Sequence, residues 1–108
     1  MNATDLTAIM EAHAAWLADS SQGERADLSG ADLSGADLCR ADLYMADLSG
    51  ADLSGADLSR ANLSKADLRG ADLSRCVLCD ANMDLARVTY RDKTIRIRFE
   101  EVKEVNRE

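Results

Sequence analysis

Residues that most catalytic and metal sites need are scarce in this chain of 108 residues. It has one histidine and three cysteines, and no nucleophile with an adjacent base or phosphate-binding loop is recognisable. We therefore expect a protein that is not an enzyme and binds no cofactor and no metal. An odd number of cysteines, without the spacing of a small disulfide-linked protein, indicates reduced thiols and a cytoplasmic location.

Basic segments and long apolar runs are also missing at the N-terminus, which reads MNATDLTAIMEAHAAWLADSS. We expect neither a signal peptide nor a membrane span, and no association with a membrane. The formal net charge of −7 argues against direct binding of nucleic acid or an anionic lipid surface. This charge is uneven, because residues 1–25 carry −3, residues 26–85 carry −6 and residues 86–108 carry +2.

What the sequence does contain is a repeat of five residues that begins at Ala26. Twelve units run to Leu85, with Ala first in eleven, Asp or Asn second in eleven and Leu third in eleven. The exceptions are Cys76, Val77 and Met83. A repeat this regular indicates a solenoid, in which each unit packs on its neighbours.

Neither a straight helix nor a straight strand can use a period of five. On a helix the leucines would rotate by about 140° per repeat, and on a strand they would alternate between the two faces. The pattern works if the chain turns once per repeat, with Ala and Leu inward, Asp outward and the last two residues at a corner. Serine and glycine suit such corners.

The fifth position indicates how many repeats make one turn. Read in groups of four, it gives Gly, Gly, Arg, Met, then Gly, Gly, Arg, Lys, then Gly, Arg, Asp, Leu. Glycine returns only in the first two columns, which favours twenty residues per coil.

This run resembles the pentapeptide repeat family, whose motif is A(D/N)LXX. The resemblance implies an all-β solenoid, a right-handed quadrilateral β-helix of about three coils filled by Leu and the small residue before it. We expect an N-terminal helical cap at residues 1–25, the β-helix at 26–88 and a C-terminal cap or dimerisation segment at 89–108.

The ends of the chain are predicted to be caps, because an open coil would expose leucine and unpaired backbone. Residues 4–18 have the spacing of a helix capped by Thr4 or Asp5. The face that we expect on the first coil comprises Leu6, Ile9, Met10, His13, Trp16 and Leu17.

At the C-terminal end, TIRIRF alternates Ile95, Ile97 and Phe99 with polar residues, as in a half-buried strand, and a short helix could follow it. This end could be a self-contained cap, or it could pair with a second copy, as several members of the family do.

Aspartates at the second position should form ladders when the repeats are stacked in fours. The two most acidic ladders are Asp27, Asp47 and Asp67, and Asp32, Asp52 and Asp72. These carboxylates could simply accept hydrogen bonds at the corners. Alternatively, some members of the family mimic DNA, bind DNA gyrase and confer fluoroquinolone resistance, and acidic ladders agree with that role.

The third and fourth faces differ from the plain glycine-cornered faces. Tyr44, Met45, Lys65 and Leu85 should gather on the fourth face, beside Arg40 and Arg60 on the third. Exposed Tyr, Met and Leu together are candidates for contact with an unidentified protein partner, although unconstrained sequence drift at outward positions would look similar.

The CVLC motif at residues 76–79 is a poor redox or metal motif, because Cys76 should point inward and Cys79 outward. The sequence thus favours a structural or protein-interaction module, with DNA mimicry as the alternative.

Overall fold

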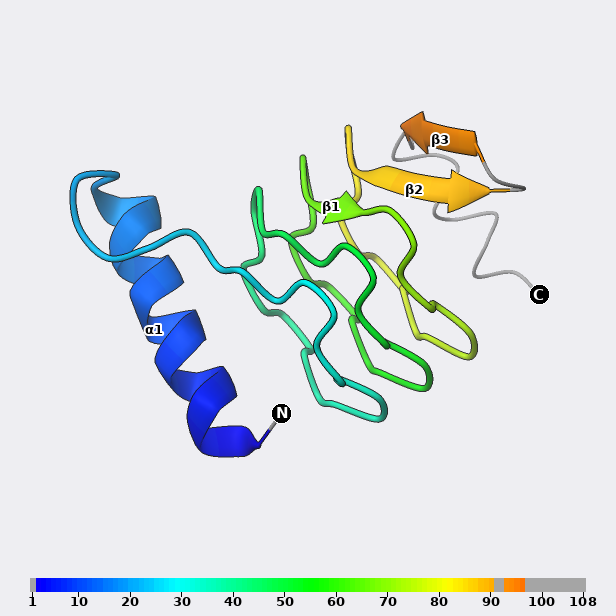
Figure 1. Cartoon of the computed structure of the whole chain (residues 1–108), viewed down its shortest axis with the longest axis horizontal. Helices are drawn as coiled ribbons and strands as arrows, with labels where there is room; N and C mark the ends of the chain where they lie inside the picture. Colours follow the sequence, from blue (N-terminus) through cyan, green and yellow to red (C-terminus); the bar gives the residue numbers. More distant parts are fainter. Residues whose placement is uncertain (1, 91–92, 97–108) are drawn as a thin grey trace.

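The computed structural model describes residues 2–90 and 93–96. Its elements are the helix α1 (Ala3–Ala18) and the strands β1 (Asp67–Leu68), β2 (Arg87–Tyr90) and β3 (Lys93–Arg96). Helix α1 lies across one end of a stack of repeated loops, and the pair β2 and β3 lies at the other (Figure 1). None of the helices in this part of the chain is long and apolar enough to cross a membrane.

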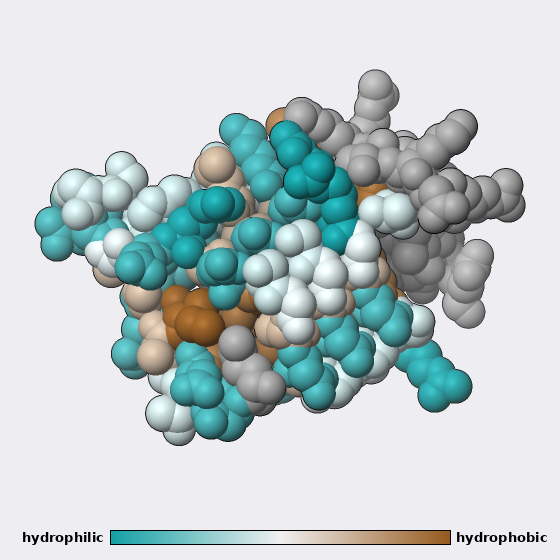
Figure 2. Space-filling model, viewed as in Figure 1, coloured by the Kyte–Doolittle hydropathy of each residue, from teal (hydrophilic) through white to brown (hydrophobic). Residues whose placement is uncertain are grey.

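Helix α1 begins one residue earlier than the sequence pattern indicated. Asn2 caps it, because the Asn2 Oδ1 accepts the Asp5 N–H at 2.8 Å, so the expected cap at Thr4 or Asp5 is wrong. Four of the six residues of the expected packing face are in place: Leu6, Ile9 and Met10 pack against the core and His13 is fully buried. Trp16 and Leu17 are half-buried. Between α1 and the first coil, hydrophobic surface is visible in Figure 2, where a pocket of about 390 Å³ is lined by residues that include Leu38 and Ala41.

The repeat region pairs with itself at a fixed distance of twenty residues. Eight parallel bridges join residues twenty apart, among them Asp27 with Asp47 and Asp42 with Asn62. The Leu28 N–H donates to the Asp47 carbonyl at 2.7 Å, and equivalent bonds recur along the chain. Each repeat therefore pairs with the fourth repeat after it, at the spacing of twenty residues that the fifth positions indicated.

The core is a stack of leucines and alanines inside these coils. Leu43, Leu48, Leu53, Leu58 and Leu63 are completely buried, as are several alanines at the first position. Burying each leucine stabilises the fold by about 1.5–3 kcal/mol relative to leaving it exposed. Met83 replaces leucine and is buried too, because its unbranched side chain fills the same inward position.

The C-terminal end of the described chain is a hairpin. Strand β2 pairs with β1 in parallel, Asp67 opposite Arg87, and with β3 in antiparallel fashion, Val88 opposite Ile95. The strand predicted from TIRIRF is therefore present in part, and β3 is the outer strand in the order β1-β2-β3. Ile97, Phe99 and the expected short helix lie outside the described residues.

Candidate functional site

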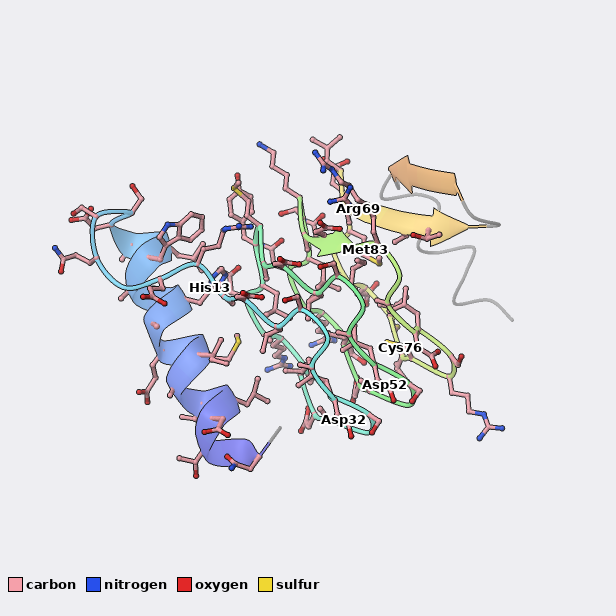
Figure 3. All side chains as sticks on the ribbon, in the orientation of Figure 1. His13, Asp32, Asp52, Arg69, Cys76 and Met83 are labelled. Atoms are coloured by element: carbon pink, nitrogen blue, oxygen red, sulfur yellow. The ribbon has the colours of Figure 1, made fainter. Side chains whose placement is uncertain are left out.

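Two ladders of aspartate run along adjacent faces of the coil. Parallel bridges join Asp27 to Asp47 and Asp47 to Asp67 in the first ladder. Two further bridges join Asp32 to Asp52 and Asp52 to Asp72 in the second. The labelled Asp32 and Asp52 lie on successive turns in Figure 3. The first ladder ends in a cation, because Arg87 is the parallel partner of Asp67 in the sheet. The structure thus places the six aspartates in two columns of residues twenty apart.

Each of these carboxylates is used in a local turn. The Asp52 Oδ1 accepts the Ser54 N–H at 2.9 Å and the Ser54 hydroxyl at 2.6 Å. The same arrangement recurs at Asp27, Asp32, Asp47 and Asp72. Asn62 does the same for Ser64 with its amide oxygen. The interpretation that these residues satisfy hydrogen bonds at the corners is thus supported by geometry.

Hydrogen bonding also decides the acidity of several ladder carboxyls. The Ser29 hydroxyl and N–H lower the pKa of Asp27, and the Ser34 hydroxyl and N–H lower the pKa of Asp32. The Ser74 hydroxyl and N–H lower the pKa of Asp72 in the same way. Donors within these three turns therefore stabilise the charged carboxylates, against the smaller opposing effect of burial.

Asp67 differs from the other ladder residues because an arginine neutralises it. The Arg69 Nε donates to the Asp67 Oδ1 at 2.9 Å, and the Arg69 Nη2 donates to the Asp67 Oδ2 at 2.7 Å. Within residues 2–90 and 93–96 this is the one ion pair shorter than 4.0 Å that the structure shows. Hydrogen bonding to Arg69 lowers the pKa of Asp67, so this carboxylate stays ionised and paired.

A surface groove gathers part of the predicted fourth-face patch. It has a volume of about 390 Å³ and is lined by Arg25, Met45, Lys65, Asp67, Leu85 and Arg87. We call this set the cationic groove. Leu85 is 40% exposed. In the described part of the chain, Leu85 and Val77 are the two large apolar side chains that are exposed.

Tyr44 lies next to this groove, whereas the two arginines of the predicted patch do not line it. The Lys65 Nζ is 5.9 Å from the centre of the Tyr44 ring, in cation–π geometry. Arg40 and Arg60 are exposed on the neighbouring face and share the left-handed backbone of the corner positions. The structure therefore brings together four of the six patch residues predicted from the sequence.

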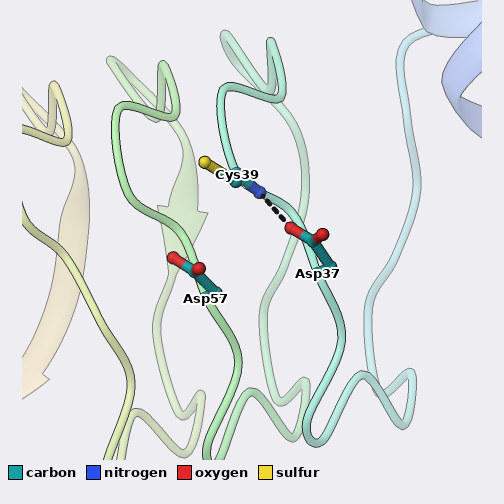
Figure 4. A group of neighbouring side chains, drawn as sticks. All are labelled: Asp37, Cys39 and Asp57. Atoms are coloured by element: carbon teal, nitrogen blue, oxygen red, sulfur yellow. Dashed lines mark hydrogen bonds between the residues drawn. The ribbon is translucent and has the colours of Figure 1, made fainter.

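Cysteines form no disulfide among the described residues, and their environments differ. Cys76 is partly buried against the core, and burial raises the pKa of its thiol to about 11. Cys39 is exposed and lies near Asp37 and Asp57, with their ligand atoms within 4.8 Å of one another (Figure 4). The Asp37 Oδ1 already accepts the Cys39 N–H at 3.0 Å, and three exposed or half-exposed groups alone do not define a metal site.

The repeat region shows to which family the chain belongs. The profile described as "Pentapeptide repeats (8 copies)" matches residues 24–55 and 56–89, which is more than half of the chain. The chain belongs to the pentapeptide repeat family. Proteins of this family fold as right-handed quadrilateral β-helices.

Solved structures of other pentapeptide repeat proteins resemble this one. The chain is 34% identical to Rfr23 from the cyanobacterium Cyanothece 51142, with a TM-score of 0.53, over 63% of this chain and 42% of Rfr23. It is 26% identical to alr5209 from Nostoc PCC 7120, with a TM-score of 0.51, over 90% of both chains.

A third similar structure is HetL from Nostoc sp. strain PCC 7120, a protein involved in the regulation of heterocyst differentiation. The chain is 37% identical to HetL over 68% of this chain and 40% of HetL, with a TM-score of 0.48. This pentapeptide repeat protein thus spans less than half the length of Rfr23 and HetL. No curated protein matches the sequence.

Sequence reasoning missed two residues of the cationic groove in this pentapeptide repeat protein, Arg25 and Arg87. A signal for Arg25 was present, because it precedes Met45, Lys65 and Leu85 at the same twenty-residue spacing. Arg87 likewise falls twenty residues after Asp67. Both residues lie just outside the twelve regular units, and counting in steps of twenty beyond these units would have placed them beside the patch.

Proposed function

We propose that this protein is a non-enzymatic structural and protein-interaction module. In this proposal residues 26–88 form a right-handed quadrilateral β-helix of about three coils between an N-terminal helical cap and a C-terminal segment. The observation that carries the proposal is the groove in which Met45, Lys65 and Leu85 meet, with Tyr44 beside it. Because leucines and alanines fill the interior, a partner has to use a side face or an end of the coil.

The side-face interaction can be tested with one double substitution. We expect Tyr44→Ala with Met45→Ser to abolish retention of a protein partner when the purified chain is used to capture partners from cells of the source organism. Cys79→Ala with Asp80→Ser is the matched control, since these are also a fourth and a fifth position and Asp80 shares the positive φ of Met45. Equal retention by both variants would contradict the proposal.

We also propose that the protein acts in the cytoplasm and forms a homodimer through its C-terminal end. Unpaired thiols at all three cysteines support the first part. The position of β3 at the edge of its sheet supports the second, because an edge strand offers backbone groups for pairing. Light scattering at several concentrations should give twice the monomer mass of 11.7 kDa, and a monomer mass at high concentration would rule out the dimer.

DNA mimicry is the second candidate, and the stacked aspartates favour it. In this case the protein would bind DNA gyrase or another topoisomerase, and micromolar protein would inhibit supercoiling by gyrase. The sharpest control replaces the six ladder aspartates by asparagine, because Asn62 makes the same turn without a charge. Inhibition by the wild type that the asparagine variant loses would support mimicry, and no inhibition at high excess would exclude it.

A further inference from the structure

We propose that the cationic groove binds a short, extended, acidic peptide segment of a partner protein, with an apolar side chain of the peptide in contact with the apolar residues of the groove. This inference rests on the proposed interaction function and specifies its ligand. The partner segment would place carboxylates against the cations and an aliphatic side chain against Met45 and Leu85.

Charge in the groove is the opposite of the charge on the rest of the coil. Arg25, Lys65 and Arg87 line it, and none of the three forms an ion pair with another residue in the described part of the chain. The single acid in the lining, Asp67, is neutralised by Arg69. A chain with a formal net charge of −7 thus presents, at one place, three cations that form no close ion pair in the described part of the chain. Carboxylates are the ligands that such a site attracts.

Arg25 is held in place before any ligand arrives. Its Nη1 donates to the Met45 carbonyl at 2.8 Å, which uses one of the five N–H groups of the guanidinium and leaves the others to bind a carboxylate. Lys65 is likewise positioned over the Tyr44 ring. Ordering these long side chains in advance reduces the entropy lost on binding.

Two apolar side chains, Met45 and Leu85, line the groove from strained corner positions. Leu85 is 40% exposed and has a φ of 60°, and Met45 has a φ of 62°. Glycine adopts this backbone without strain. It occupies the corresponding corner position on another face of the coil, at Gly30, Gly50 and Gly70. An exposed leucine surrounded by cations offers an apolar contact that a purely ionic ligand would not use.

The size of the groove selects a short peptide. The corners at residues 45, 65 and 85 follow one another at the inter-strand spacing, which is about 4.8 Å. Arg25 lies about one further spacing along, because it directly precedes Ala26, whose carbonyl accepts the Asp47 N–H, so the groove spans about 14 Å. An extended chain advances about 3.3 Å per residue, and four to five residues cover this length. A nucleic-acid strand would extend beyond the groove over the acidic ladders at Asp27 and Asp47, which repel phosphate.

The test is a titration of the purified full-length protein into a fluorescein-labelled peptide Glu-Leu-Glu-Leu-Glu, followed by fluorescence anisotropy. We expect saturable binding that weakens as salt is raised. The charge-reversed peptide Lys-Leu-Lys-Leu-Lys and the neutral peptide Gln-Leu-Gln-Leu-Gln should bind at least tenfold more weakly. Equal binding of the acidic and neutral peptides would overturn the proposal.

Substitutions then locate the site. Lys65→Gln, Arg87→Gln and Leu85→Ser should each weaken binding of the acidic peptide at least fivefold. Arg60→Gln is the matched control, because Arg60 is a corner cation with positive φ that does not line the groove, and it should change binding less than twofold. If Arg60→Gln weakens binding as much as Lys65→Gln, the peptide follows general surface charge and the proposal is wrong.

The chain's own acidic residues near the C-terminus provide the competing occupant. If the full-length Glu100→Gln, Glu101→Gln and Glu104→Gln variant binds the peptide several-fold more tightly than the wild type, the groove belongs to this segment and not to a partner. Unchanged affinity supports the partner. Failure of all peptides to bind, while Tyr44→Ala with Met45→Ser still abolishes partner capture, would reject the acidic ligand and leave the interaction function standing.

Discussion

At the scale of single residues, the corners of the coil depend on one backbone conformation. The fifth residue of each of the twelve repeats has a positive φ, between 57° and 73°. Five of these positions are glycine, and seven carry a side chain in the left-handed region. Side chains are tolerated there because the corner points outward, as at Gly30, where an added Cβ would meet nothing within 4 Å.

Alanine at two glycines should therefore have different effects. We expect Gly30→Ala to lower the free energy of unfolding by about 1 kcal/mol, since only the left-handed backbone opposes it. Gly23→Ala should cost more, because its Cβ would lie 2.2 Å from the Ala12 carbonyl oxygen. Urea unfolding of both variants measures the difference, and equal losses would contradict this account.

The second position needs an oxygen acceptor more than it needs a charge. We expect Asp52→Asn to leave the free energy of unfolding within about 0.5 kcal/mol of the wild type, because the amide oxygen can accept from Ser54 as Asn62 accepts from Ser64. Asp52→Ala removes the acceptor and should cost about 1 kcal/mol. Urea denaturation is the measurement, and a loss for Asp52→Asn as large as that for Asp52→Ala would show that charge matters.

At the scale of elements, α1 is joined to the coil through a buried histidine. The His13 Nδ1 accepts the Ala26 N–H at 2.9 Å, and its ring stacks on Trp16 with 5.6 Å between the ring centres. The His13 Nε2 is buried with no hydrogen-bond partner among the described residues. Figure 3 shows His13 between the helix and the first coil. Only the neutral imidazole can accept at Nδ1, so this junction requires deprotonated histidine.

Acid should therefore weaken this end of the molecule before the carboxylates titrate. Burial lowers the pKa of His13, an effect that the charge of Asp42 opposes and that of Arg25 reinforces. Because the unfolded chain binds this proton first, the stability that His13 contributes is full above about pH 6.5 and is lost as the pH falls below it. Fluorescence of Trp16, the single tryptophan, should show a lower urea midpoint at pH 5 than at pH 7.5.

His13→Asn is the control for this pH dependence. Asparagine offers an oxygen near the position of Nδ1 and does not titrate, so its urea midpoint should change little between pH 5 and pH 7.5. The comparison uses the change with pH within each variant, so any constant loss of packing cancels. Identical pH dependence in the two proteins would assign the effect to another group.

At the scale of the whole molecule, stability comes from stacking coils on one another. Leu58 lies in the middle of the stack and is completely buried, whereas Leu73 is only partly buried. In a repeat protein each unit contacts its neighbours, so the loss depends on where in the stack a cavity opens.

We expect Leu58→Ala to lower the free energy of unfolding by about 2–5 kcal/mol through lost burial and a cavity. Leu73→Ala removes the same atoms from a less buried position and should cost clearly less. Urea unfolding followed by circular dichroism compares the two, and equal losses would contradict the dependence on burial.

The sequence by itself determined the coil of this protein. A five-residue repeat cannot bury its leucines in a straight helix or strand, and the recurrence of glycine at the corners favoured twenty residues per turn. The face of α1 also followed from the spacing of its apolar residues. The helix cap at Asn2 did not, because Asn2, Thr4 and Asp5 are all good caps and local propensity does not choose among them.

The tertiary structure alone decided how side chains from distant segments meet. Arg25 precedes the regular repeats and Arg87 follows them, yet both line one groove with Lys65. The neutralisation of Asp67 depends on the direction that Arg69 takes, and the hydrogen bond of His13 depends on the angle at which α1 meets Ala26. A periodic sequence specifies where the backbone passes, because each turn repeats the one before it. It does not specify contacts among irregular residues, since these depend on side-chain directions and on the packing of the ends.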